Sequence, residues 1–285
     1  MMKFMLAARR KPEDTQQRYF YEWGVIHVAL MITNPTTQRA FKRYTQHYSI
    51  NGVSSELLWH PLSPMAWDNM ADHWLERFED LELSLRGEDY VRRMLPHKFG
   101  DSNFVVELTG GRVLHEAADF QNGGVKLIHF LKTRPGLGQE EFDRRWQAEH
   151  APTVLAALQP LGILCKYVQN PRIALDASTF KGTLFEAGGV GRHGGVEEFW
   201  FRDLNDLTRL RNDATAWNRI KASDAKLTAE SGSFSMVTTE RVIFDYVTPG
   251  RQTPKPAVLM PGTLEALIDS HGYGGFNIPK LPGER

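Results

Sequence analysis

The stretch 139-QEEFDRRWQAEHAPTVLAAL-158 decides the fold. Within it Phe142, Trp146, His150 and Val154 recur every four residues, which places them on one stripe of an amphipathic helix that faces the core. A histidine on such a stripe is either a neutral core residue or a chemical group aimed into a pocket. The pattern therefore predicts a core-facing helix with one polar side chain on its apolar face.

The composition of the 285-residue chain excludes several classes of protein. Lys and Arg number 34, as do Asp and Glu, so no overall field favours nucleic acid or an anionic membrane. The single cysteine, Cys165, cannot form an intramolecular disulfide and fits a reducing compartment. The first residues lack a signal-peptide pattern, and no run approaches the roughly 18 apolar residues of a membrane span. We expect a cytoplasmic protein without a nucleic-acid or membrane partner.

The helical stripe occurs a second time, 123 residues earlier in the chain. The identities at this offset are Lys3 and Lys126, Pro12 and Pro135, Gln16 and Gln139, Trp23 and Trp146, His27 and His150, Tyr44 and Tyr167, and Gln46 and Gln169. Tryptophan and histidine are uncommon residues, and the hydrophobic pattern follows the same register. We interpret the match as an internal duplication.

Each copy is predicted to have the element order β-α-β-β-α-β. In the first copy we predict strands near 3–9, 41–50, 72–75 and 103–116, with helices over 16–32 and 78–94. In the second copy, helices over 139–158 and 204–223 and a last strand over 234–246 occupy the corresponding places. This order is that of a ferredoxin-like unit, in which two helices cover one face of a four-stranded antiparallel sheet.

The other face of each sheet must also be buried, and the tandem copy is the available partner. We therefore predict an α+β fold in which two ferredoxin-like repeats pack sheet to sheet as an intramolecular pseudo-dimeric α+β barrel. The proposed domains are residues 1–119, residues 120–247 and a proline-rich C-terminal extension, 248–285. Two long connections, 53–70 and the glycine-rich 174–195, are expected to be functional lids or mobile loops.

Residues 125–154, VKLIHFLKTRPGLGQEEFDRRWQAEHAPTV, resemble the opening of an EthD-family domain of the dimeric α+β barrel superfamily. The matching parts are Lys-x-Arg-Pro-Gly-Leu after the strand, then Glu-x-Phe and Trp-x-x-x-His-Ala-Pro on the helix. The first copy keeps Trp23 and His27 but has Ala29 in place of the proline. Similar proteins include polyketide-pathway dehydratases, decarboxylases and cyclases, lactone isomerases, and accessory proteins of ether or aromatic degradation. The wider superfamily also holds cofactor-free monooxygenases and haem enzymes.

His150 and His27 are the candidate catalytic residues, because an imidazole can take or give a proton near neutral pH. Alternatively, each is a hydrogen-bonded core histidine. The candidate substrate-binding residues are Trp146 and Trp23 as an aromatic wall, Tyr167 and Tyr44 as hydroxyl donors, and His129 and His193 as further polar groups. Ordinary packing explains the same residues equally simply.

No metal or cofactor is predicted. The chain lacks His-Glu-x-x-His, cysteine pairs and a phosphate-binding glycine loop. Together with the resemblance, this predicts a cofactor-independent enzyme performing lyase or isomerase chemistry on an aromatic or other apolar small molecule, as a monomer or homodimer. Dehydration, decarboxylation, deformylation and rearrangement are the reactions expected. The alternatives are a non-catalytic binding accessory of an oxygenase and a haem-dependent oxidase or peroxidase.

Overall fold

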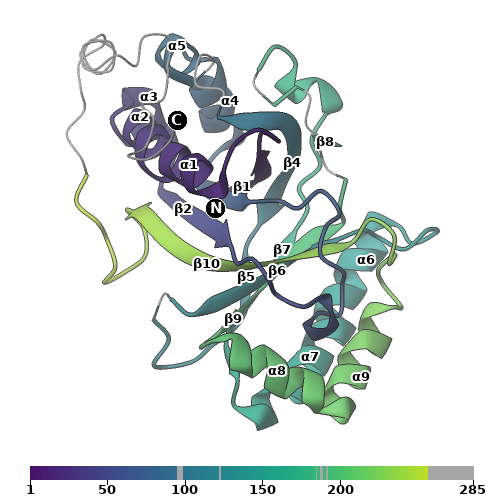
Figure 1. Ribbon diagram of the computed structural model, residues 1–285. Coiled ribbons are helices and arrows are strands. Elements are labelled where there is room, and N and C mark those ends of the chain that lie inside the picture. The colour runs from purple at the N-terminus through teal and green to yellow at the C-terminus, as the bar shows by residue number, and fades with distance from the viewer. Residues whose placement is uncertain (95–98, 122, 184, 187–188, 191, 256–285) are drawn as a thin grey trace.

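The computed structural model describes residues 1–94, 99–121, 123–183, 185–186, 189–190 and 192–255. Two units of similar element order follow each other along the chain (Figure 1). The first comprises β1 (Met2–Arg10), α1 (Gln16–Tyr21), the π-helical η1 (Glu22–His27), α2 (Val28–Ile32), α3 (Pro35–Ala40), β2 (Arg43–Ser49), η2 (Ser55–Leu57), β3 (Asn69–Leu75), α4 (Phe78–Arg86), α5 (Glu88–Met94), β4 (Gly100–Gly110) and β5 (Arg112–Glu116). The second comprises β6 (Val125–Leu131), α6 (Gln139–Arg145), the π-helical η3 (Trp146–His150), α7 (Ala151–Leu158), η4 (Gln159–Leu161), β7 (Leu164–Pro171), η5 (Ala177–Phe180), β8 (Gly189–Val190), β9 (Gly195–Phe201), α8 (Leu204–Asn212), α9 (Ala214–Asp224) and β10 (Phe234–Asp245).

The two sheets join into one barrel because the C-terminal strands of each unit pair with strands of both units. The strand order is β5-β7-β9-β6-β10-β2-β3-β1-β4-β8. β10 pairs with β6 of its own unit through its first half and with β2 of the first unit through its second half. Likewise β4 pairs with β1, and β5, which follows it after one residue, pairs with β7 of the second unit. These two seams close the ring and confirm the predicted α+β barrel.

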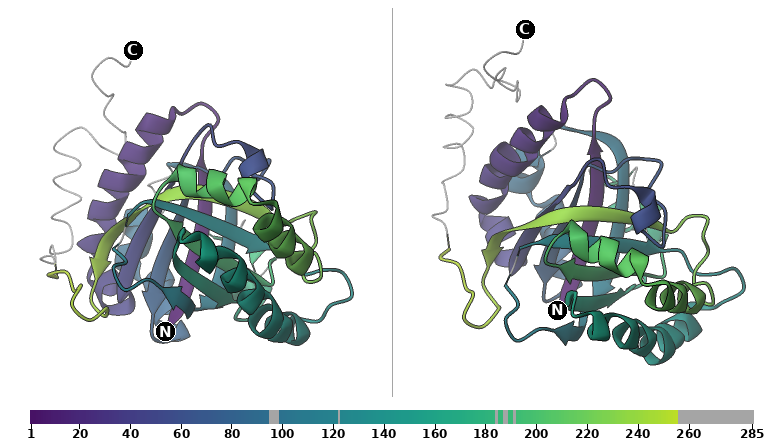
Figure 2. Two further views of the ribbon diagram at one scale, coloured as in Figure 1. Left: turned by 90° about the horizontal axis from the view of Figure 1, so that it is seen from below. Right: turned by 60° about the horizontal axis from the view of Figure 1, so that its bottom comes forward.

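The helices of each unit lie outside the barrel on opposite sides (Figures 1 and 2). Odd residues of β1 face the interior and even residues face the helices, as the alternation of a strand requires. Phe4, for example, belongs to a cluster with helical residues of the first unit, whereas Met5 packs with residues of both units. Within the described residues, no helix has the length and apolar character needed to cross a membrane.

The repeated lysines, Lys3 and Lys126, meet inside the barrel. Lys3 Nζ lies 2.5 Å from Glu198, and Lys126 contacts the other oxygen of the same carboxylate. Lys126 Nζ also lies 3.2 Å from Glu240 and 3.8 Å from Asp72, and all these side chains are buried. Because buried charges must be paired, this cluster ties residues of the two units together.

The matched helices of the two units each contain a π-helical segment, and this segment explains the identity between Gln46 and Gln169. In both units the segment ends at the histidine of the stripe, His27 or His150. Gln46 Nε2 donates to the carbonyl of Trp23 at 3.0 Å, and Gln169 Nε2 donates to the carbonyl of Trp146 at 3.0 Å. A π-helical turn frees a backbone carbonyl from the regular ladder, and the glutamine satisfies it.

Replacing Gln169 by methionine should lower the free energy of unfolding by about 1–3 kcal/mol, because it removes the donor to the buried Trp146 carbonyl. Gln169 also donates to the Tyr167 hydroxyl at 3.0 Å, so two bonds are lost. Urea unfolding measures the effect. The same substitution at the exposed Gln159 is the control and should change stability by less than about 0.5 kcal/mol. Equal losses in the two variants would contradict the assigned role of Gln169.

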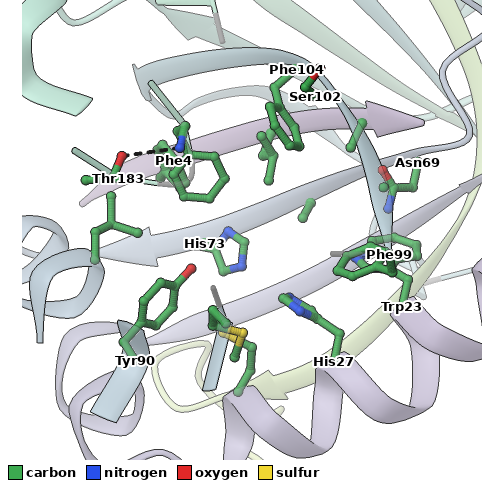
Figure 3. Close-up of a pocket in the computed structure, with 18 of the residues that line it drawn as sticks. Phe4, Trp23, His27, Asn69, His73, Tyr90, Phe99, Ser102, Phe104 and Thr183 are labelled. Atoms are coloured by element: carbon green, nitrogen blue, oxygen red, sulfur yellow. Dashed lines mark hydrogen bonds between the residues drawn. The ribbon is translucent and has the colours of Figure 1, made fainter. Parts of the chain in front are cut away.

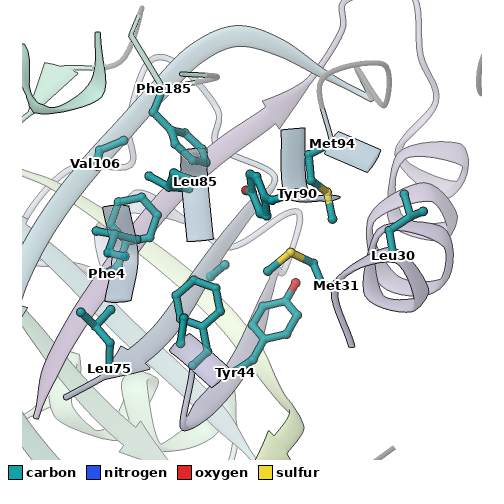
Figure 4. Packing of buried hydrophobic residues seen from close by; sticks show 14 of the residues in the cluster. Phe4, Leu30, Met31, Tyr44, Leu75, Leu85, Tyr90, Met94, Val106 and Phe185 are labelled. Carbon is teal, nitrogen blue, oxygen red and sulfur yellow. The ribbon is translucent and has the colours of Figure 1, made fainter. Parts of the chain in front are cut away.

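The two long loops cross over between the units. Leu58 and Trp59, from the loop between β2 and β3, belong to the core cluster of the second unit. Phe180 and Phe185, from the loop between β7 and β9, belong to the core cluster of the first, where Figure 4 shows Phe185 near Val106. Arg86 donates to the carbonyls of two residues in this second loop, at 2.9 and 3.1 Å. The described parts of both loops therefore serve as packed covers.

Several local features differ from the sequence prediction. Beyond the predicted helix over 16–32, Pro35 starts a further helix, α3, and the Asn34 side chain accepts hydrogen bonds from its first turn. The predicted strand over 103–116 is divided at Gly111 into the two strands of a seam. Of the C-terminal extension, only residues 248–255 lie among the described residues.

Candidate functional site

A cavity of about 390 Å³ lies in the first unit between the sheet and its helices (Figure 3). Even residues of β1 and odd residues of β3 form its floor. The lining consists of Phe4, Leu6, Ala8, Trp23, His27, Met31, Phe41, Asn69, Ala71, His73, Leu85, Tyr90, Met94, Phe99, Gly100, Asp101, Ser102, Phe104, Thr183 and Phe185. Aromatic and aliphatic side chains dominate, and a few polar groups converge among them. This composition is typical of a site for an apolar small molecule.

The cavity exists because two positions on its floor have small or apolar side chains in the first unit and polar or charged side chains at the matching places in the second. Leu6 pairs with Ala71 across β1 and β3, and His129 pairs with Glu197 across β6 and β9, in the same register. Ala71 therefore stands where the second unit has Glu197, and Leu6 stands where it has His129. The small side chain of Ala71 leaves space beneath the helices.

His73 is the most deeply buried histidine of the cavity. Its ring stacks on Tyr44 with centroids 4.6 Å apart, as Phe199 stacks on Tyr167 at the corresponding place in the second unit. Burial lowers the pKa of His73 to about 4, because it disfavours the charged form. A neutral imidazole offers one donor and one acceptor, so His73 can hold a substrate oxygen or hydroxyl.

His27 and Trp23, both predicted site residues, line this cavity from the π-helical segment. His27 is half-buried, and its ring packs on Phe99 at 5.1 Å. Trp23 is buried and packs on Tyr48 with ring centroids 4.7 Å apart. Figure 3 shows His27 and His73 directed towards the same space. The half-buried histidine is the one placed to exchange a proton with solvent.

Tyr90 and Asn69 complete the polar groups deep in the cavity. Burial raises the pKa of the Tyr90 hydroxyl, so it stays protonated and can donate a hydrogen bond. In Figure 3 this hydroxyl points towards His73. Asn69 is buried, and its side-chain oxygen has no hydrogen-bond partner among the described residues. A ligand with both donor and acceptor groups would satisfy this set.

In the second unit, four predicted site residues surround one carboxylate, that of Glu197. Trp146 Nε1 and the Tyr167 hydroxyl donate to it, at 2.5 and 2.7 Å. His150 Nε2 lies 3.4 Å away and His129 Nδ1 3.8 Å away. These partners outweigh the effect of burial and hold the pKa of Glu197 well below its ordinary value. The predicted residues do come together, but as a packed ionic cluster.

Trp59 occupies the space that is open in the first unit. This residue comes from the crossing loop of the first unit, and its ring lies 4.3 Å from that of His129. It also packs edge-on against Phe199 and Trp217, at 5.3 and 6.1 Å. The second unit therefore has a core where the first has a cavity.

Two further predicted residues lie away from the cavity surface. Tyr44 is fully buried behind His73, and its hydroxyl accepts a hydrogen bond from Gln46 at 2.8 Å. His193 is buried and bonded to Glu107 at 2.8 Å, with its ring packed against Phe130 at 5.5 Å. Neither lines the cavity, so their roles in substrate binding stay predictions without support from its geometry.

Among the described residues, one group has metal-ligand spacing, formed by His47, Asp72 and Glu198 inside the barrel. The Lys126 ammonium already lies between these carboxylates, at 3.8 Å from Asp72 and in contact with Glu198. A divalent cation would compete with this fixed positive charge. The group therefore fits a lysine-centred ion cluster better than a metal site.

His73, Tyr90 and Asn69 line the cavity but were not among the predicted site residues. His73 is not one of the identities between the repeats, because the second unit has Phe199 at this place. A comparison of the repeats for differences at core positions would have found it, together with Ala71.

Comparison with known proteins agrees with this architecture. Residues 134–231 match the EthD domain family. A solved structure described as an anthrone oxidase-like protein is similar, with a TM-score of 0.51 and 13% identity over 87% of this chain and 95% of that one. A mutant chlorite dismutase from Candidatus Nitrospira defluvii has a TM-score of 0.48 and 10% identity over 84% and 91% of the two chains. No curated protein matches the sequence. Residues 134–231 are thus similar to an EthD domain, within a chain whose two units form an α+β barrel.

Proposed function

We propose that the cavity of the first unit binds a flat, mainly aromatic small molecule and that the protein catalyses proton-transfer chemistry on it without a cofactor. The observation that supports this most strongly is the convergence of His27, His73 and Tyr90 in an aromatic-lined cavity of about 390 Å³. Its volume lies within the range of about 300–1,000 Å³ usual for small-molecule sites.

The three groups suit different parts of one reaction. His27, at the half-buried end, takes a proton from a carbon or hydroxyl of the substrate. His73 and Tyr90, both neutral, donate hydrogen bonds to the oxygen on which negative charge develops. The proton held by His27 then returns to another atom, which is an isomerisation, or leaves with a hydroxyl group as water, which is a dehydration. Both reactions are of the lyase or isomerase kind.

The second candidate function is binding without turnover, as in an accessory protein of an oxygenase. One observation favours this second function. Phe185, from the loop between β7 and β9, covers the cavity, and its ring centroid lies 5.4 Å from that of Phe4 and 5.8 Å from that of Phe104. Such a cover would protect a bound aromatic compound during delivery as well as during a reaction. Product analysis after incubation separates the two functions.

Filling the cavity should abolish ligand binding. We expect one or more compounds from a panel of aromatic acids, phenols and polycyclic ketones such as anthrone to stabilise the wild type by about 2.7 kcal/mol at 100 times the dissociation constant. Ala71→Leu should remove this stabilisation, because the added side chain enters the space beneath the helices. Thermal unfolding with and without ligand measures both results.

The matched control is His150→Asn, at the place in the second unit that corresponds to His27 in the first. Each variant is compared with its own ligand-free midpoint, so a loss of intrinsic stability does not affect the comparison. Full ligand stabilisation in Ala71→Leu, or its loss in His150→Asn alone, would place the ligand outside the first unit. A Soret band in protein produced with added haem would show that the protein binds haem and would overturn the cofactor-free proposal.

A further inference from the structure

A second cavity, of about 310 Å³, lies in the second unit between the π-helical η3 with α7 and the end of α9. Unlike the first, it is lined mainly by polar and charged side chains, including His150, Ser223, Arg219 and Lys226. It lies on the side of His150 that carries Nδ1, since the other nitrogen lies beside the buried Glu197. The proposed reaction in the first unit makes no use of it.

A chain of polar contacts leads from the core to this cavity. Glu197, fixed by Trp146 and Tyr167, lies 3.4 Å from His150 Nε2. His150 Nδ1 in turn lies 3.0 Å from the Ser223 hydroxyl oxygen. When His150 carries both protons, its Nδ1–H donates to Ser223, and the serine hydroxyl hydrogen is left free to point into the cavity. Through these contacts the buried Glu197 carboxylate orients His150, and His150 orients the Ser223 hydroxyl as a hydrogen-bond donor at the cavity wall.

The lining of the cavity also carries an excess of positive charge, from Arg219 and Lys226 against Glu149. Arg219 and Lys226 are both exposed, and neither forms an ion pair with any residue that the structure describes. The one acidic residue of the lining, Glu149, is exposed and lies 3.5 Å from Arg144, so the lining presents two cations against one carboxylate. On the other side of His150 lies Glu197, and Asp224 at the end of α9 accepts from Thr228 and lies 3.2 Å from His60 Nε2. An anion entering the cavity would therefore meet two unpaired cations and a hydroxyl donor.

We infer that this cavity binds a small oxyanion, the carboxylate or phosphate group of a metabolite or the free ion itself, through Arg219, Lys226 and the Ser223 hydroxyl. Carboxylate and phosphate share the chemistry that this set recognises, because both present two or more acceptor oxygens to charged donors. The site is separate from the cavity of the first unit, so its occupancy neither requires nor replaces the proposed reaction.

Isothermal titration of the full chain at about 0.15 M ionic strength, with inorganic phosphate and separately with acetate, tests the inference. Saturable one-to-one binding of at least one anion is expected. Arg219→Ala and Lys226→Ala should each weaken it about tenfold, and Ser223→Ala about threefold to tenfold, as for charge-assisted and neutral hydrogen bonds respectively. Binding of phosphate alone would assign a phosphate ester or ion, and binding of acetate alone would assign a carboxylate.

The matched control is Lys221→Ala, which removes the same charge from the same helix but does not line the cavity. It should leave the affinity within about twofold, because exposed charges at a distance are screened. A loss in Lys221→Ala as large as in Arg219→Ala would show attraction by overall charge and overturn the inference. So would the absence of saturable binding by either anion up to about 10 mM.

Discussion

Replacing Lys126 by methionine should lower the free energy of unfolding by about 3–5 kcal/mol, the largest stability effect that we expect for a single substitution. The Lys126 ammonium contacts Glu198 and lies 3.2 Å from Glu240 and 3.8 Å from Asp72. It also lies over the ring of Trp200 at 4.2 Å. Methionine fills similar space but leaves three buried carboxylates with insufficient compensation, and breaking a buried ionic cluster costs more than its net contribution.

Lys166→Met is the control for this substitution. Lys166 also lies over Trp200, at 5.5 Å, but its ion pair with Glu116 is at the partly exposed rim. Exposed pairs contribute about 0–1 kcal/mol, so the control should lose no more than that. Urea unfolding at neutral pH compares the two variants. Similar losses in both would show that the interior cluster is not a principal link between the units.

The same cluster predicts the direction of the acid dependence. The neighbouring cations outweigh burial and hold the pKa values of Glu198, Glu240 and Asp72 below their ordinary values. Groups with a depressed folded-state pKa contribute stability above their unfolded pKa of about 4, and this contribution is lost as pH falls through the folded-state value. In Lys126→Met the loss should begin at higher pH, because the carboxylates are then more easily protonated.

Replacing His27 by asparagine should reduce turnover of an identified substrate by about 10²- to 10⁴-fold, the range for loss of a general acid or base. Affinity should change much less, because the aromatic lining that holds the ligand remains. Single-turnover kinetics, together with the dissociation constant from thermal or calorimetric titration, separates the two quantities. Such a result would assign proton transfer to the first unit.

His150→Asn provides the matched comparison, because His150 occupies the same place in the duplicated helix. It belongs to the Glu197 cluster and does not line the large cavity, so turnover per folded molecule should persist. If His150→Asn abolished turnover and His27→Asn did not, the assignment of the base would be wrong. Unchanged turnover in both variants would leave His73 as the remaining imidazole of the cavity to carry the proton.

The sequence predicted the fold well because the residues shared by the two repeats are those that the fold needs. Lys3 and Lys126 meet inside the barrel, and Gln46 and Gln169 bind the carbonyl freed by the π-helical turn. These contacts recur in both units, so the identities survive as a visible pattern. Periodicity also placed the helices and the last strands of both repeats near their observed positions.

The candidate site was harder to predict because it depends on the positions at which the repeats differ. Ala71 in place of Glu197 opens the cavity, and His73 in place of Phe199 supplies its deepest polar group. A search for identities passes over such positions. The four predicted residues of the second unit do gather, but around the Glu197 carboxylate, which no identity between the repeats marks.

Nothing in the sequence indicated that each long loop packs against the other unit. Trp59 fills the second unit although it belongs to the first, and Phe185 covers the first although it belongs to the second. Loops have no periodicity that indicates the surface on which they pack, and these contacts depend on the relation between the two units. Only the assembled barrel shows why the first unit has an apolar cavity between its sheet and helices and the second unit has a packed core at the matching place.

A crystal structure with a bound aromatic compound from the ligand panel tests most directly whether the first unit holds the working cavity. We predict ligand density between β1, β3 and the π-helical segment, next to His27 and His73 and beneath Phe185. Density for the compound beside His150 in the second unit, with the cavity of the first unit unoccupied at saturating ligand, would contradict the account.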